Sequence, residues 1–406
     1  MYVAESRMKW FVLTVCCIVV MVNAGIRMSF GVFFKPLQDV LGTSRYNVSL
    51  IQSFFELGFG FFQLVTGRLV DIAGPKKVIL AGLAVLAGAF LLVSKVQSVL
   101  MLFLVYGVMV AFGAGSTSLV AAIAVARQWF VTKSNLAVSS LTASLSAGQL
   151  ILIPAVSYFV SAYGPASGFR LLSVLSLTAF IVVAIGLHNK AGSPREKPKN
   201  QTSRPPLALR EVCQSRSFWV FGLTFAACGF GFSFIVTHFI PFATDLHMHS
   251  GQASGAMALI GGVSIAGTLL AGYVSDIYSK RKITALLFFI RALAMAMLFG
   301  NISHFTVYTF AVVIGLTWTA TVPLISSLSV ERFGAENTGS VLGALFLLHQ
   351  AGAAAGSYLG GLIAEYTHGY HAMFAITAAV DLMAAAVILT HKKVLHRPHF
   401  TEATRG

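Results

Sequence analysis

The chain carries little charge for its length. Only 10% of its 406 residues are Asp, Glu, Lys or Arg, and 57% are hydrophobic, whereas a soluble domain has about 25% charged and about 45–50% apolar residues. A soluble fold of this length has too little interior to bury so many apolar side chains. The shortage of charge therefore excludes a soluble enzyme, a disordered chain and a secreted disulfide-rich protein, and it predicts a protein surrounded by lipid.

Cysteine is scarce as well, and no nucleotide-binding pattern is present. The four cysteines, which match neither CxxC nor a Cys/His metal pattern, are Cys16, Cys17, Cys213 and Cys228, so we expect reduced thiols and no metal. No G-x-x-x-x-G-K-[ST] run occurs, so neither ATP drive nor any other cofactor is expected. The first apolar run, 10–34, lacks a small-residue cleavage site, which argues against a removable signal peptide.

Long apolar runs dominate what is present. A helix crosses the bilayer with about 20 mostly apolar residues. Twelve runs qualify: 10–34, 46–69, 77–95, 98–126, 134–162, 169–187, 217–243, 251–275, 283–302, 305–330, 337–364 and 370–391. The connections are short except for the Pro-rich, basic segment 188–216, which is typical of a linker. We therefore predict six spans in 1–187, a cytoplasmic linker at 188–216, and six spans in 217–406.

The basic residues lie mainly on one side of these spans. With the N-terminus placed inside, 22 of the 28 Lys and Arg fall in inner segments and 4 in outer segments. This asymmetry follows the positive-inside rule and predicts that both termini are cytoplasmic. It also explains the net charge of +15 without a nucleic-acid partner.

The two halves of the sequence share a repeated loop. Residues 67–77 (GRLVDIAGPKK) align with 272–282 (GYVSDIYSKRK), and Arg127 aligns with Arg332 at the same offset of 205 residues. Repeats with the same topology are related by an axis along the membrane normal. Two equivalent bundles of helices are therefore expected.

This repeated loop resembles a known family. The pattern G-x-x-x-D-x-x-G-x-[KR]-[KR] is similar to that of the major facilitator superfamily, although Ser279 replaces a glycine in the second copy. The runs 29–37 (SFGVFFKPL) and 126–130 (ARQWF) resemble the monocarboxylate-porter and oxalate/formate-antiporter group. The resemblance implies an all-α membrane protein of twelve helices in two pseudo-symmetric six-helix bundles. These would rock about a central site, with spans 1, 4, 7 and 10 around it and spans 3, 6, 9 and 12 as support.

The loop residues are candidates for gating. An acid at one helix end and bases at the next can join the halves in one state and release them in another. The alternative is that these charges only set the topology. The candidates are Asp71, Lys76, Lys77, Asp276 and Arg281.

Two ionisable residues in the first two spans are candidates for substrate and proton binding. A charge inside the membrane is costly, so such a residue suggests function. Arg27 offers a planar fork to a carboxylate, or else it serves a structural partner. Glu56 is the one ionisable member of a polar stripe in span 2 and is a candidate proton carrier, or it hydrogen-bonds a neighbouring helix.

Five further polar or aromatic residues are substrate-binding candidates. His349 and Gln350 lie near the middle of span 11, where the following glycines (352, 356, 360 and 361) indicate close helix packing. His349 could also carry a proton. Gln149 occupies a comparable place in span 5, and together these residues would form a polar floor. His238 and Trp318 are the other two candidates, each with packing as the alternative.

Arg291 and Asp381 lie in the supporting spans 9 and 12. Each lies ten residues from the inner end of its span, which is about 15 Å from the cytoplasmic face. Equal depth predicts a buried ion pair. The alternatives are that Arg291 binds the anion, that Asp381 carries the proton, or that the two have separate partners. Span 8 has no basic residue, whereas related porters draw a substrate arginine from it.

These observations predict a secondary transporter in the membrane, with a small organic anion as substrate and proton symport as the coupling. An exporter of a metabolite, a drug or a polycarboxylate siderophore is the alternative on the same fold. A non-transporting sensor is the alternative from another class. Short termini argue against the sensor, and together with short outer loops they favour a bacterial origin. We expect a monomer in a bacterial inner membrane that acts as a transporter and not as an enzyme.

Overall fold

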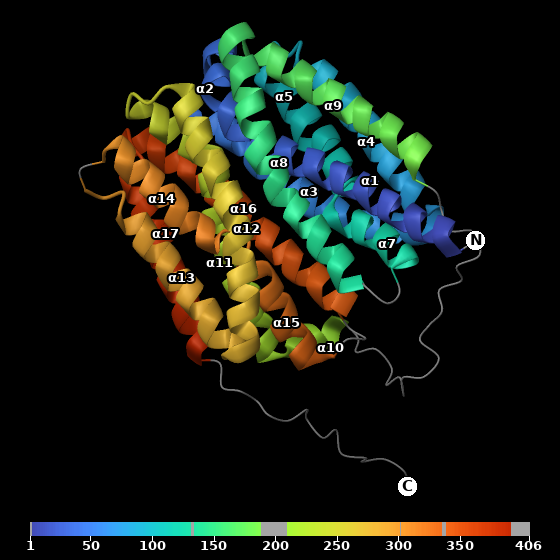
Figure 1. Cartoon of the computed structure of the whole chain (residues 1–406). Helices are drawn as coiled ribbons and strands as arrows, with labels where there is room; N and C mark the ends of the chain where they lie inside the picture. The colour runs from blue at the N-terminus through green and yellow to red at the C-terminus, as the bar shows by residue number, and fades with distance from the viewer. Residues whose placement is uncertain (1, 131–133, 188–208, 301, 335–337, 391–406) are drawn as a thin grey trace.

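The structure is a computed structural model that describes residues 2–130, 134–187, 209–300, 302–334 and 338–390 (Figure 1). The described residues form helices and connections without strands. In the N-terminal half the helices are α1 (Tyr2–Met28), α2 (Phe30–Leu41), α3 (Arg45–Ala73), α4 (Pro75–Val93), α5 (Val99–Leu104), the π-helix η1 (Val105–Val110), α6 (Ala111–Ser116), α7 (Leu119–Trp129), α8 (Ser134–Tyr163) and α9 (Pro165–Gly186). In the C-terminal half they are α10 (Leu209–Gln214), α11 (Arg216–Asp245), α12 (Ser250–Ile277), α13 (Lys280–Ala296), α14 (His304–Thr317), α15 (Thr321–Phe333), α16 (Thr338–Thr367) and α17 (His371–Thr390).

Twelve helical crossings account for this part of the chain. Within the described ranges, 11 helical segments are long and apolar enough to span a membrane. The remaining crossing is α13, which has 17 residues and contains Arg291. The predicted limits of this span, 283–302, are wrong at their C-terminal end, because the chain already turns after Ala296.

Three crossings are interrupted, which the apolar pattern alone does not predict. The first breaks at Ser29, the fourth at 117–118 and the tenth at 318–320. At the fourth, Asn23 Nδ2 donates to Ala114 O and to Thr117 Oγ1, both at 2.8 Å. A carbonyl freed by a helix break in an apolar interior needs such a donor, so Asn23 stabilises the interruption.

The segment predicted as a linker contains a packed element. Helix α10 lies within it, and Val212 of this helix is buried. Trp219 Nε1 donates to the carbonyl oxygen of Cys213 at 2.8 Å. The predicted linker 188–216 therefore contains one short helix, which packs against α11 and α16. Residues 188–208 lie outside the described ranges.

Helices α11 and α16 are in backbone contact within the C-terminal half. A methyl group at Gly352 would overlap the carbonyl oxygen of Ala226, and one at Gly356 would overlap that of Phe230. Small residues permit this approach between helices in a membrane. The close packing expected from the glycine spacing is present here.

The two halves meet along three helix pairs: α3 with α16, α8 with α12, and α2 with α11. Figure 1 shows the N-terminal half (blue to green) beside the C-terminal half (yellow to red). We call the end of the molecule where α3 begins and α11 finishes the Asp245 end. The opposite end, where α9 finishes and α10 begins, is the linker end.

Candidate functional site

A guanidinium–carboxylate pair lies between the first two crossings. Arg27, in the last turn of α1, places Nη2 3.1 Å from Glu56 Oε2 on α3. The guanidinium also lies 3.8 Å from the centre of the Phe59 ring. The Arg27 side chain is 15% exposed and that of Glu56 is 1% exposed. Arg27 therefore has a carboxylate partner while part of its side chain remains accessible.

Glu56 receives two further hydrogen bonds, one of them from the other half of the chain. Gln52 Nε2 donates to Oε1 at 3.0 Å, and Gln350 Nε2 of α16 donates to Oε2 at 2.9 Å. With Arg27, three donors thus converge on one carboxylate. Because Gln350 lies across the interface, this carboxylate also connects the two halves.

His349 extends the same network into aromatic surroundings. Its Nδ1 lies 2.7 Å from Gln350 Oε1, which makes the amide oxygen an acceptor of the Nδ1 proton. The imidazole packs against Phe225 with ring centres 4.6 Å apart, and Phe232 lies 6.0 Å away. One polar chain thus runs from His349 through Gln350 and Glu56 to Arg27, along an aromatic wall.

Gln149 and Trp318 form a second polar contact between the two halves of the chain. Trp318 Nε1 donates to Gln149 Oε1 at 3.0 Å, and Gln149 Nε2 donates to the carbonyl oxygen of Met257 at 2.9 Å. Trp318 lies in the break of the tenth crossing and stacks on Phe232 at 4.7 Å. Gln149 thus belongs to a separate polar contact from His349 and Gln350, and Phe232 packs against both Trp318 and His349. That these residues form one polar floor stays a prediction.

His238 takes part in neither of these two polar contacts. Its Nε2 is 2.9 Å from the carbonyl oxygen of Ser357, and its Nδ1 is 3.3 Å from the Tyr370 hydroxyl. The ring is completely buried and packs edge-on against Phe34 of the N-terminal half. The structure therefore places His238 below the Asp245 end, as part of the packing between α2, α11 and α16.

Arg291 and Asp381 face each other inside the C-terminal half. Arg291 Nε lies 3.6 Å from Asp381 Oδ1, and both side chains are 0% exposed. The guanidinium also donates to Cys228, through Nη1 to Sγ and through Nη2 to the carbonyl oxygen, each at 3.4 Å. Among the residues that the structure describes, no donor lies within hydrogen-bond range of either carboxylate oxygen of Asp381. Arg291 thus contacts α11 and α17 of its own half.

The candidate gating residues lie at the linker end. Lys76 Nζ donates to the carbonyl oxygen of Ala184 on α9, within the N-terminal half. Lys77 and Asp276 are exposed, and Arg281 is half-buried. The side chain of Asp71 lies outside what the structure describes. Their role in gating stays a prediction.

An ionic cluster that the sequence did not single out joins the halves at the Asp245 end. Asp245 of α11 accepts from Lys35 Nζ at 2.6 Å, from Arg45 Nη1 at 2.8 Å and from Arg45 Nη2 at 3.2 Å. The available signal was only that Lys35 and Arg45 are two of the few basic residues on that side. Beside them lies Tyr370, whose burial raises the pKa of its hydroxyl, so this group stays protonated.

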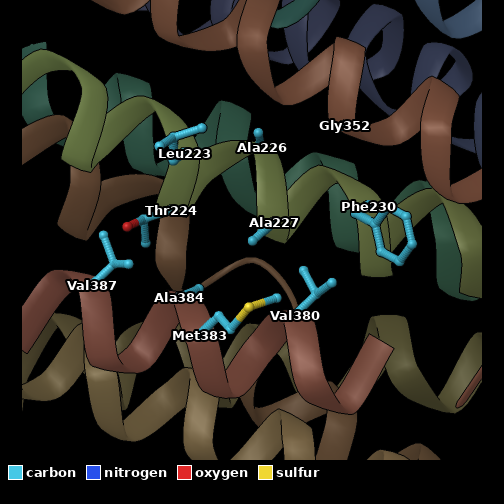
Figure 2. A pocket seen from close by; sticks show the side chains of 10 residues that line it. All are labelled: Leu223, Thr224, Ala226, Ala227, Phe230, Gly352, Val380, Met383, Ala384 and Val387. Carbon is cyan, nitrogen blue, oxygen red and sulfur yellow. The ribbon is translucent and has the colours of Figure 1, made fainter. Parts of the chain in front are cut away.

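An apolar pocket has none of these polar groups in its lining. It measures about 290 Å³ and its lining comes from α11, α16 and α17 (Figure 2). Thr224 is the one polar side chain among the residues drawn there, and Leu223 and Met383 are more than half exposed. This pocket offers no charge to a polar ligand, so the candidate site is the network around Glu56.

Twelve membrane crossings with a buried polar network between two sequence halves define a multi-pass membrane transporter of the two-bundle kind. The chain belongs to the Major Facilitator Superfamily, whose sequence profile matches residues 16–357 and 242–405. The fold and family implied by the repeated loop are thereby confirmed.

Several relatives align over almost the full chain. An uncharacterised MFS-type transporter of Bacillus subtilis, YcxA, is 28% identical, covering 95% of both chains. The oxalate:formate antiporter of Oxalobacter formigenes is 25% identical, covering 93% of this chain and 90% of its own. Monocarboxylate transporter 12 of Xenopus laevis is 20% identical, covering 96% and 89%.

A solved structure has the same fold. It is a bacterial homologue of the human lysosomal transporter Spinster in an inward-facing, unoccupied conformation, with a TM-score of 0.77 and 15% identity. The match covers 94% of this chain and 96% of that chain.

Proposed function

We propose that this chain is a proton-coupled secondary transporter of small organic anions, with carboxylates as the substrate class. One observation carries the proposal. Arg27, whose side chain is partly accessible, is paired with a carboxylate, Glu56, that also accepts a hydrogen bond from the opposite half. Substrate binding and the contact between the halves therefore converge on Glu56.

The substrate anion would take the place of Glu56 on Arg27. A guanidinium presents two parallel N–H groups to a carboxylate and does not lose its proton. Phe59 lies beside the Arg27 guanidinium, and Phe232 lies beside His349 at the other end of the network, so both offer ring surfaces for the rest of the substrate. Since Glu56 occupies the fork in this state, the substrate must compete with it.

A proton on Glu56 removes that competition. The neutral carboxyl no longer attracts Arg27 and gives up acceptor capacity toward Gln52 and Gln350. Proton and anion therefore favour each other at this site, which is the coupling that symport needs. Loss of the Gln350 bond also loosens the interface between α3 and α16. His349 is the alternative proton carrier, through Gln350.

We assign the two gates that alternating access needs to the two ends of the molecule. The Asp245 end is closed in this state by the cluster of Lys35, Arg45 and Asp245. We place this end outside the cell and the basic linker end in the cytoplasm, because lysine and arginine concentrate in inner segments.

The names of the relatives support the anion class. One is an oxalate:formate antiporter and another is a monocarboxylate transporter. The arrangement around Arg291 favours a single anion-binding arginine in this chain, because that guanidinium is fully buried against Asp381.

Uptake into proteoliposomes tests the proposal. A panel of radiolabelled mono- and dicarboxylates, with and without an inward proton gradient, should contain at least one anion that wild-type protein accumulates. Arg27→Gln should abolish this uptake, while Arg170→Gln, which removes an exposed arginine on α9, should not. Normal uptake by Arg27→Gln, or accumulation of neutral solutes alone, would overturn the proposal.

A further inference from the structure

The cluster at the Asp245 end has the geometry of a carboxylate-binding site. Arg45 presents both terminal nitrogens to the two oxygens of Asp245, at 2.8 Å and 3.2 Å. Lys35 adds a third contact at 2.6 Å. A bidentate guanidinium with an added ammonium is a strong arrangement for a carboxylate.

The parts of this site belong to different halves of the chain. Lys35 on α2 and Arg45 on α3 are both in the N-terminal half, whereas Asp245 is in the C-terminal half. When the halves part at this end, the two cations stay together and lose their carboxylate. All three side chains are between 26% and 33% exposed, so the outside solution reaches them.

Most of the groups around Arg45 come from the C-terminal half of the chain. The Tyr370 ring lies 5.6 Å from the Arg45 guanidinium, and Glu365 on α16 accepts the backbone N–H of Arg45 at 3.0 Å. Tyr370 and Glu365 both belong to the C-terminal half, and the N-terminal half adds the exposed Asp39 four residues after Lys35. When the halves part, Glu365 leaves together with Asp245, so Lys35 and Arg45 then exceed the one nearby carboxylate of their own half, Asp39.

We propose that Lys35 and Arg45 form a second, outer anion-binding site that receives the substrate carboxylate before it reaches Arg27. Asp245 occupies this site in the closed state as a tethered carboxylate. The proposal rests on the anion transport proposed above for the choice of ligand. External anion and Asp245 compete for the same two cations, so a bound anion favours opening of this end. The paired cations also attract anions from solution, and salt weakens that attraction.

Electron–electron distance measurements test the site independently of transport. Nitroxide labels on Val40→Cys and Tyr366→Cys, which replace exposed residues of α2 and α16, report the separation of the halves at this end. The unmutated chain, labelled in parallel, accounts for the four native cysteines. Sodium acetate and sodium benzoate are titrated at constant ionic strength against sodium chloride, with acetamide as the neutral control.

We expect acetate to increase the population with the longer distance, and acetamide to leave it unchanged. Asp245→Asn should raise the longer-distance population only in part without anion, because the uncharged amide still covers the two cations. It should lower the half-effect concentration of acetate about tenfold, because the tethered carboxylate is gone. The double variant Lys35→Gln/Arg45→Gln should also open but should no longer respond to acetate. Asp39→Asn, a matched loss of a carboxylate at the same surface, should behave as wild type.

An acetate response that persists in the double variant would overturn the site, and so would no response in Asp245→Asn. The two proposals fail separately. If acetate acts through Lys35 and Arg45 but no carboxylate is transported, the outer site stands and the proposed transport is wrong. If carboxylates are transported through Arg27 while Asp245→Asn ignores acetate, the transport stands and the outer site is wrong.

Discussion

The described part of the chain holds two arginine–carboxylate pairs within its membrane-crossing helices, in contrasting surroundings. Arg27–Glu56 is separated by 3.1 Å, has three donors on the carboxylate, and leaves the arginine 15% exposed. Arg291–Asp381 is separated by 3.6 Å, is completely buried, and leaves the carboxylate oxygens without hydrogen-bond donors. The first pair has a partner in the opposite half. The second is enclosed in one half.

The difference indicates that the same two side chains serve two purposes. A pair that water can reach, and whose carboxylate has replacement donors, can exchange its partner for a substrate or a proton. A pair that water cannot reach cannot exchange its partner, because separating the two side chains strands a charge in a low-dielectric interior. We therefore assign the first pair to transport and the second to stability.

The largest effect should come from breaking the enclosed pair. Arg291→Met or Asp381→Asn alone should destabilise the protein by about 3–5 kcal/mol, because the remaining charge is buried without its partner. The double variant should be more stable than either single variant. Thermal unfolding in detergent, analysed as a double-mutant cycle, measures this coupling.

A second double-mutant cycle, on Arg27→Met and Glu56→Gln, gives the corresponding coupling for the partly exposed pair. Its single variants should lose only about 1–3 kcal/mol, since Arg27 is partly exposed and Gln52 and Gln350 remain with residue 56. Equal losses in the two cycles would remove the distinction between the pairs. Normal stability with lost transport in Arg291→Ala would make Arg291 an anion ligand instead.

The second effect concerns coupling through Glu56. Glu56→Gln cannot take up a proton, so accumulation driven by a pH gradient should fall at least about tenfold, while counterflow exchange without a gradient continues. Uptake and counterflow in proteoliposomes measure both activities. Glu211→Gln, which changes an exposed carboxylate on α10, is the matched control. If Glu56→Gln and His349→Ala both still accumulate substrate, Asp381 is the next candidate for the proton.

The third effect concerns the hydrogen bond that Gln350 donates to Glu56 from the other half. Gln350→Leu removes the donor to Glu56 and the acceptor for His349, and should cost about 1–2 kcal/mol of stability in this state. The initial transport rate should change together with the pH at half-maximal rate, since the carboxylate has lost one donor. Gln97→Leu, at an exposed position, controls for the substitution. An unchanged pH profile would separate Gln350 from the proton site.

The smallest effect is expected at the second polar contact between the halves, between Gln149 and Trp318. Trp318→Phe keeps an aromatic ring on Phe232 but removes the N–H that Gln149 accepts. The loss should be about 0.5–1.5 kcal/mol in thermal stability, with the apparent substrate affinity changing less than about threefold. Trp10→Phe, an exposed ring on α1, is the control. A complete loss of transport would move the substrate site toward Trp318.

Much of the fold follows from composition and residue counting. The apolar runs locate the crossings because lipid permits few other surfaces, and counting from helix ends places Arg291 and Asp381 at one depth. The breaks at Ser29, 117–118 and 318–320 are a different matter. Pro323 lacks the N–H that would bond the carbonyl oxygen of Thr319, so it marks the third break, but no proline stands at the same distance from the other two. The Asn23 donor that stabilises the second break comes from another helix, 91 residues away.

The site was predictable as a set of residues but not as a set of contacts. Arg27, Glu56 and Gln350 stand out as polar groups in apolar runs, yet nothing in their spacing says that they touch. That depends on the crossing of α1, α3 and α16. Lys35, Arg45 and Asp245 look like ordinary loop charges in sequence, because their importance depends on which state brings the halves together.

The glycines of the closed state provide a steric means of trapping conformations. Gly361 of α16 packs against Ser49 of α3, and a methyl group at Gly31 of α2 would lie 2.6 Å from the carbonyl oxygen of Val236 on α11. These contacts join opposite halves, unlike those of Gly352 and Gly356, which persist inside one half. Alanine at Gly31 or Gly361 is thus a wedge that disfavours closure while sparing the fold. Such variants would present the Asp245 end to antibodies or ligands selected for the open form.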